Sequence, residues 1–166
     1  MTTEVATLDA RAAWTKLRSF ERSVARYALV AGRLLFAAIF ILSAPGHFSA
    51  QTIGYAAQHG VPLSPVLVPL SGLIALAGGA SVLLGYRATI GAWLLVLFLV
   101  PVTLTMHAFW GIHDPTMAMT QQMMFMKNLT MLGGALVIAY FGAGPLSFDH
   151  RRESSKAPPS TPPSAP

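Results

Sequence analysis

Residues 66–110 read VLVPLSGLIALAGGASVLLGYRATIGAWLLVLFLVPVTLTMHAFW, two apolar runs separated by the single charged residue Arg87. Each run is close to the ~20 residues that an α-helix needs to cross ~30 Å of hydrocarbon. Because lipid offers no hydrogen-bond partners to the backbone, apolar runs of this length cross a membrane as helices. The stretch therefore predicts two membrane-spanning helices, at about 66–85 and 88–110, joined in a tight antiparallel hairpin.

Similar apolar runs flank this hairpin, at about 28–48 and 117–142. The whole chain is 54% hydrophobic and only 10% charged, whereas a soluble domain carries about 25% charged residues. The absence of cysteine excludes disulfides, thiol redox chemistry and thiolate metal sites. We therefore predict an all-α integral membrane protein, a bundle of four transmembrane helices that occupies residues 28–148.

The basic residues predict the orientation of this bundle. Nine of the eleven Lys and Arg residues lie on one side of the four spans. These are Arg11, Lys16, Arg18, Arg22, Arg26, Arg87, Arg151, Arg152 and Lys156. Cytoplasmic loops accumulate Lys and Arg, so both termini are predicted to be cytoplasmic. The net charge of +5 then indicates anionic lipid headgroups as neighbours, and not nucleic acid.

The segments outside the spans also carry local signals. In residues 1–27, apolar residues recur every three or four positions from Trp14 to Tyr27, which predicts an amphipathic helix on the cytoplasmic surface. A solvated helix leading into the first span is the alternative. Ser49 is predicted to cap a short helix on the outer surface, and Asp114 with Pro115 to start the fourth span. The proline-rich residues 149–166 predict a disordered cytoplasmic tail.

Lys127 is the most unusual residue of the spans. It lies about 10 Å inward of Thr120, taking 1.5 Å of rise per residue, and no acidic residue falls within any span. We expect it to point into the bundle with its helical neighbours Thr130 and Gly134. A buried ammonium without a carboxylate partner needs an anion, a dipole or water. Lys127 is therefore predicted to bind a ligand headgroup.

Other polar residues are predicted to join Lys127 in the outer half of the bundle. They are His47, His107, Trp110 and Asn128. Taken singly, each histidine is explained as an interfacial residue that faces water; as a set they favour a binding site. Arg33, about 9 Å beyond Tyr27 on the inner side, either extends to the lipid headgroups or anchors an anionic or quinoid headgroup.

Methionine is concentrated in MAMTQQMMFM, residues 117–126. Thioether ligands suit Cu(I), but these methionines do not share one helix face. Ordinary packing is therefore the prediction, and no metal site is predicted.

Several motifs together resemble one family of membrane proteins. RLLFAAIFILSAPGHF, GGASVLLGYR, HAFW and KNLTMLGG are similar to segments of the DoxX family, small four-helix membrane proteins, over roughly residues 28–148. The resemblance implies a bacterial-type cytoplasmic (inner) membrane protein and a link to quinone-dependent redox or oxidative-stress complexes. Arg33, His107, Lys127 and Asn128 match polar positions of that family. Ala75 stands where many of its members carry a glutamate.

The functional prediction combines these observations. We expect an accessory membrane subunit, without a catalytic set of its own, that binds a quinone or a lipid headgroup. Its predicted partners are the lipid bilayer, an oxidoreductase and a second copy of the chain. A small transporter or lipid-handling protein that uses the same polar half-bundle is the alternative.

Overall fold

The computed structural model describes residues 2–156, with side chains described from Trp14 onward, and this part of the chain contains helices and no β-strand. The helices are α1 (Thr2–Ser43), the short 3-10 helix η1 (Ala44–Phe48), α2 (Ala50–Gln58), α3 (Ser64–Leu84), α4 (Ala88–Met106), α5 (Pro115–Phe141) and α6 (Phe148–Lys156). Four stretches within residues 2–156 are long and apolar enough to cross a membrane: Trp14–Phe48, Ser64–Leu84, Ala88–Met106 and Pro115–Phe141. The predicted all-α architecture with four spans is confirmed.

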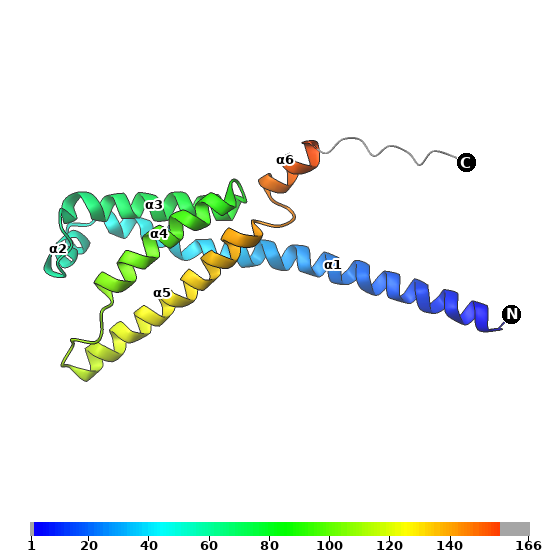
Figure 1. Cartoon of the computed structure of the whole chain (residues 1–166), viewed down its shortest axis with the longest axis horizontal. Helices are drawn as coiled ribbons and strands as arrows, with labels where there is room; N and C mark the ends of the chain where they lie inside the picture. The colour runs from blue at the N-terminus through cyan, green and yellow to red at the C-terminus, as the bar shows by residue number, and fades with distance from the viewer. Residues whose placement is uncertain (1, 157–166) are drawn as a thin grey trace.

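The long helices follow one another side by side, α1 against α3, α3 against α4 and α4 against α5 (Figure 1). Because α1 and α4 run in one direction and α3 and α5 return, the bundle has two different ends. We call the end with the α3–α4 turn, the C-terminus of α5 and α6 the basic end; it is the predicted cytoplasmic side. The opposite end, with η1, α2 and the α4–α5 loop, is called the α2 end.

α1 is one continuous helix of 42 residues, where the sequence predicts a separate surface helix before the first span. At 1.5 Å per residue it is about 63 Å long, roughly twice the hydrocarbon thickness of a bilayer. No Gly or Pro occurs between residues 2 and 31, so nothing in the sequence interrupts the helix. α1 ends at Ser43, two residues before Pro45.

The predicted caps at the α2 end are confirmed. The Ser49 side chain accepts a hydrogen bond from the backbone N–H of Thr52, and α2 begins after it. The Asp114 carboxylate accepts from the backbone N–H of Met117 at 2.7 Å and starts α5 at Pro115. These caps satisfy N–H groups that the first turn of a helix leaves free.

The C-terminal tail differs from the prediction of disorder from residue 149. Phe148–Lys156 forms α6, and residues 157–166 lie outside the described part of the chain. Ser147 caps α6 by accepting from the backbone N–H of His150 at 3.1 Å. The Asp149 carboxylate accepts from the backbone N–H groups of Arg87 and Ala88, at 2.7 and 2.9 Å. α6 is therefore held in place by hydrogen bonds to the α3–α4 turn. The amino-acid composition of the tail gives no indication of this contact.

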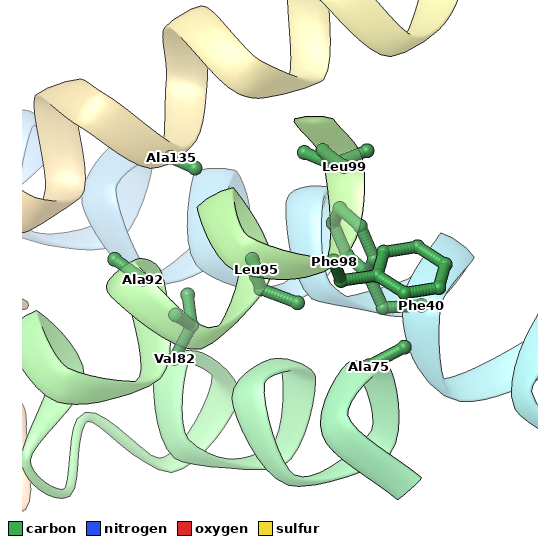
Figure 2. Packing of buried hydrophobic residues seen from close by; sticks show 8 residues of the cluster. All are labelled: Phe40, Ala75, Val82, Ala92, Leu95, Phe98, Leu99 and Ala135. Carbon is green, nitrogen blue, oxygen red and sulfur yellow. The ribbon is translucent and has the colours of Figure 1, made fainter. Parts of the chain in front are cut away.

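The core lies between α3, α4 and the facing sides of α1 and α5 (Figure 2). Its buried members are Phe40, Ala75, Val82, Ala92, Leu95, Phe98, Leu99 and Ala135. Small residues allow the helices to approach closely: a Cβ on Gly79 would lie 3.1 Å from the Cβ of Phe40. On Gly78 it would lie 2.8 Å from a methyl carbon of Leu95. α3 thus presents glycine to both of its neighbours, α1 and α4, which lets the backbones approach closely.

Candidate functional site

A cavity of about 560 Å³ lies at the α2 end, between α3 and α4 and beneath α2. Its volume is within the range of about 300–1,000 Å³ that is usual for small-molecule sites. α3 and α4 supply an apolar wall: Leu67, Val68, Leu70, Ile74, Leu97, Phe98, Pro101, Val102 and Met106. The lining contains no Asp, Glu, Lys or Arg. The site therefore suits an apolar molecule without a formal charge.

The aromatic polar side chains of the cavity come from the elements at its outer edge, while Ser71 of α3 and Thr105 of α4 add hydroxyls to the wall. His47 of η1, Tyr55 of α2 and His107 after α4 all line it. Nδ1 of His107 lies 2.8 Å from Oε1 of Gln121 in α5, and Nε2 of Gln121 donates to the Tyr55 hydroxyl at 3.4 Å. Three elements, α2, α4 and α5, are thus connected by one short chain of hydrogen bonds.

These contacts determine what each group offers to a ligand. A carbonyl oxygen only accepts, so Nδ1 of His107 donates to Gln121 and Nε2 is the acceptor of the neutral ring. His47 is held in the same way, with Nδ1 3.2 Å from the carbonyl oxygen of Ser43. Because the Tyr55 hydroxyl accepts from Gln121, its own hydrogen remains free to donate. The cavity edge therefore combines one hydroxyl donor with two imidazole acceptors.

Close packing fixes the position of His47. A Cβ on Gly72 of α3 would lie 2.6 Å from the Cβ of His47, so only glycine lets η1 approach α3 so closely. The His47 ring meets Phe98 of α4 edge-on, with 5.5 Å between ring centroids. A rigidly held imidazole loses little freedom on binding a ligand, which favours affinity.

A proline contributes to the same wall. Pro101 lies inside α4 and has no N–H to donate to the carbonyl of Leu97, four residues before it. Both residues line the cavity. α4 therefore lacks one helical hydrogen bond at the cavity wall.

The structure does not bring Lys127, Asn128 or Trp110 into this cavity. Trp110 is 65% exposed and packs with Phe109 and Phe125 instead. Asn128 is buried, 5% exposed, but is absent from the cavity lining. Of the six predicted site residues, the structure places His47 and His107 together.

The expectation that Lys127 points into the bundle is wrong. The side chain is exposed, and its Nζ lies 3.3 Å from the Sδ of Met124 on the same helix. The buried residues of α5 are Asn128 and Ala135, seven positions apart, which places them on one helix face. Successive residues of a helix differ by about 100° in direction, so Lys127 lies beside that face and not on it.

Arg33 lies at the opposite, basic end. It is 6% exposed, and its Nη2 donates to the carbonyl oxygen of Leu146 at 2.9 Å. Its Nε and Nη1 have no hydrogen-bond partner among the described residues. α3 and α5 both end here, at Leu84 and Phe141, and the negative ends of their helix dipoles stabilise a cation. Arg33 thus lies away from the cavity, with its guanidinium between the α3–α4 turn and the segment that follows α5.

Residues 5–154 match the sequence profile of the SURF4 family. The chain belongs to the SURF4 family. The inner membrane protein YqjF of Escherichia coli (strain K12) is 33% identical over 129 residues, which cover 73% of this chain and 88% of YqjF. No solved structure matches the chain. The identification as a DoxX member is wrong, because the family that matches almost the whole chain is SURF4.

Sequence reasoning missed two residues of the site in this SURF4-family protein, Tyr55 and Gln121. Tyr55 lies in the predicted short helix, where no polar partner is visible in sequence. Gln121 lies in the methionine-rich stretch 117–126, which directs attention to sulfur ligands. The sequence did contain one signal for Gln121. It lies near the predicted start of the fourth span, and His107 lies near the end of the third, so the two side chains are expected at the same end of the bundle.

Proposed function

We propose that this integral membrane protein of the SURF4 family binds an amphiphile with an uncharged headgroup in the cavity at the α2 end. The apolar tail lies between α3 and α4, and the headgroup bonds Tyr55, His47 and His107. The observation that carries the proposal is an apolar wall with hydrogen-bonding groups along one edge.

The position of the cavity supports a ligand that enters from lipid. Leu67, Leu70 and Leu97 line the cavity and are also 39%, 46% and 60% exposed on the surface of the spans. In a membrane this surface contacts acyl chains, so a tail reaches the cavity without crossing water. The headgroup then remains at the α2 end, beside the hydrogen-bonding side chains.

The chemistry of the edge limits the headgroup. Tyr55 donates and the two imidazoles accept, which fits a headgroup that carries both carbonyl and hydroxyl oxygens. A diacylglycerol has both, with ester carbonyls and one free hydroxyl. An isoprenoid quinone offers carbonyl acceptors to Tyr55 when oxidised and hydroxyl donors to the imidazoles when reduced. An anionic phospholipid does not match, because the lining has no cation to offset the cost of burying its charge.

The accessory role in a redox complex is not carried into this proposal. It was predicted from the resemblance to DoxX proteins, and the SURF4 match removes that basis. The ligand part of the prediction has support of its own, because His47 and His107 line one cavity.

The second candidate function is lipid handling without transport from one end of the bundle to the other. A transporter needs a path between the two ends of the bundle, but Val82, Leu95 and Leu99, at most 1% exposed, fill the space between α3 and α4. The same cavity therefore favours the capture or presentation of a lipid at one side of the membrane.

The test measures what the full chain retains during purification. The protein and its His107→Ala variant are extracted in mild detergent, and quinone, diacylglycerol and phospholipid are quantified per mole of protein by mass spectrometry. We expect one uncharged amphiphile to be retained by the parent protein and several-fold less by the variant. His113→Ala is the matched control, since His113 is exposed in the α4–α5 loop and absent from the lining.

Two results would overturn the proposal. One is equal retention by the His107→Ala variant and the parent protein. The other is retention of anionic phospholipid in preference to both uncharged classes, which would require a cationic site elsewhere on the protein.

A further inference from the structure

The N-terminal half of α1 carries a row of exposed apolar side chains. Leu17, Phe20, Val24 and Tyr27 are 53%, 69%, 51% and 69% exposed. Figure 1 shows this half of α1, in blue, extending away from the other helices. Since α1 is one unbroken helix, the row continues along the same axis as the part of α1 that packs in the bundle.

The spacing of the row is that of a coiled coil. Leu17, Phe20, Val24, Tyr27, Ala31 and Leu34 follow one another at steps of three and four, a strict seven-residue repeat, and all six are exposed. Such a repeat keeps one narrow face in contact with a partner helix over its whole length. In heptad notation, Leu17, Val24 and Ala31 are a positions, and Phe20, Tyr27 and Leu34 are d positions.

The charged residues fit the same register. Arg18, Arg22 and Arg26 occupy b, f and c positions, which face away from the partner in a two-stranded coiled coil. Lys16 occupies a g position, and Glu21 the following e position. Both are exposed. In a parallel pair of helices, g of one chain meets the following e of the other, so Lys16 faces Glu21 of the second copy.

Within one helix, Lys16 and Glu21 do not face each other. Side chains interact along a helix at separations of three and four residues, whereas these two are five apart. They lie on opposite flanks of the apolar row. In a parallel pair of copies, however, Lys16 of one copy lies next to Glu21 of the other, and their charges are opposite.

Membrane topology requires a parallel arrangement. Two copies inserted in one membrane have the same orientation, and the simplest symmetric pair is related by a two-fold axis along the membrane normal. We propose that two copies of this protein pair through α1 as a parallel coiled coil over residues 14–34. Ala31, at an a position inside the span, permits the close approach that helices need within lipid. The pairing uses no cavity residue and is tested independently of ligand binding.

The first experiment uses the absence of cysteine from the chain. Single cysteines replace each residue from Lys16 to Tyr27 in turn, and disulfide-linked dimer is measured in native membranes after mild oxidation. A disulfide needs the two Cα atoms within about 7 Å. We expect dimer at Leu17, Phe20, Val24 and Tyr27, several-fold above the outward positions Arg18, Arg22 and Ala25, which are the matched controls.

A helix that lies on the membrane surface gives a different result. The cross-links then show no seven-residue repeat, and Trp14 fluorescence, measured with Trp93 and Trp110 replaced by phenylalanine, is quenched by lipids with brominated headgroup-proximal chains. Either finding would overturn the coiled-coil pairing.

The second experiment tests the register by exchange of charge. Lys16→Glu places two acidic residues opposite each other and should reduce the cross-link from a cysteine at Phe20 several-fold. The double variant Lys16→Glu, Glu21→Lys restores opposite charges and should restore the cross-link. A double variant that cross-links no better than the single one would show that the two residues do not face each other.

Discussion

The two ends of the bundle are built in different ways. At the basic end, hydrogen bonds join segments far apart in the chain: Arg33 to Leu146, and Arg87 and Ala88 to Asp149, over 113, 62 and 61 residues. At the α2 end most polar contacts are local, such as Ser49 with Thr52 and His59 with Tyr55. Long-range hydrogen bonds join the segments of the basic end, whereas the α2 end holds the apolar cavity of the candidate site.

The two ends are therefore expected to contribute to different properties, the basic end to the stability of the fold and the α2 end to ligand binding. Contacts between distant segments are lost only when the fold opens, so they contribute to global stability. Groups around a cavity contribute less to the fold and remain available to a ligand. We therefore expect substitutions at the basic end to change stability, and substitutions at the α2 end to change ligand retention.

The largest effect is expected at Gly85, the C-cap of α3. Its φ is +63°, and a Cβ there would collide with Nη1 of Arg33 and Cβ of Ser147. Left-handed backbone costs about 1–2 kcal/mol and overpacking about 1–3 kcal/mol, so Gly85→Ala should lower the free energy of unfolding by about 2–4 kcal/mol. Thermal unfolding in detergent, followed by loss of helical circular dichroism, measures it.

Gly60 provides the matched control at the α2 end. Its φ is +76°, but a Cβ would have no atom within 4 Å. Gly60→Ala therefore carries only the backbone cost of about 1–2 kcal/mol. If Gly85→Ala and Gly60→Ala lower the free energy of unfolding by the same amount, the close packing of Arg33 against the α3–α4 turn does not contribute to the cost at Gly85.

The next largest effect on the free energy of unfolding is expected at the aspartates that cap helices, one at each end of the bundle. Asp149 caps α4 from a distant segment with two backbone hydrogen bonds, whereas Asp114 caps α5 locally with one. We expect Asp149→Ala to cost about 2 kcal/mol and Asp114→Ala about 1 kcal/mol. Asp149→Ala should also make α6 sensitive to protease, because it releases the helix from the α3–α4 turn. Protection of α6 in both variants would contradict this role of Asp149.

A smaller effect on stability is expected at Gln121, where the α2 end has its one bridge between distant segments. Gln121→Leu removes the partner of His107 and Tyr55 while keeping similar volume. The cost in stability should be about 0.5–1 kcal/mol. Retention of the amphiphile should nevertheless fall several-fold, because His107 and Tyr55 lose their fixed orientation. The neighbouring Gln122→Leu, on an exposed residue, is the control.

The sequence was sufficient for features that depend on neighbouring residues. Apolar runs predicted the four spans, and Ser49 and Asp114 predicted the starts of α2 and α5, because a cap and its helix are adjacent. α6 was not predicted, since its stabilising partner lies about 60 residues earlier in the α3–α4 turn. The family was misidentified because its motifs are short and largely apolar, and many membrane helices share such segments.

The candidate site was predicted only in part for a related reason. His47 and His107 end their helices, so the direction of the chain places them at one end of the bundle. Lys127 lies in the middle of a helix whose polar residues are spread around its circumference, so hydropathy gives no information on which face meets α4. Its direction depends on the packing of α5, which the sequence pattern does not contain.

The smallest effect on stability and on ligand retention is expected from Lys127→Met. Lys127 lies on an exposed face of α5, outside the cavity, so the substitution tests whether that face takes part in binding. The substitution keeps an unbranched side chain, removes a charge from the surface of a span and leaves every cavity residue in place. We expect the free energy of unfolding to stay within about 0.5 kcal/mol or to rise, since a charge within a span is costly. Ligand retention, measured as for His107→Ala, should not change. A several-fold loss of ligand would instead show that the headgroup extends from the cavity to α5 and that Lys127 binds it.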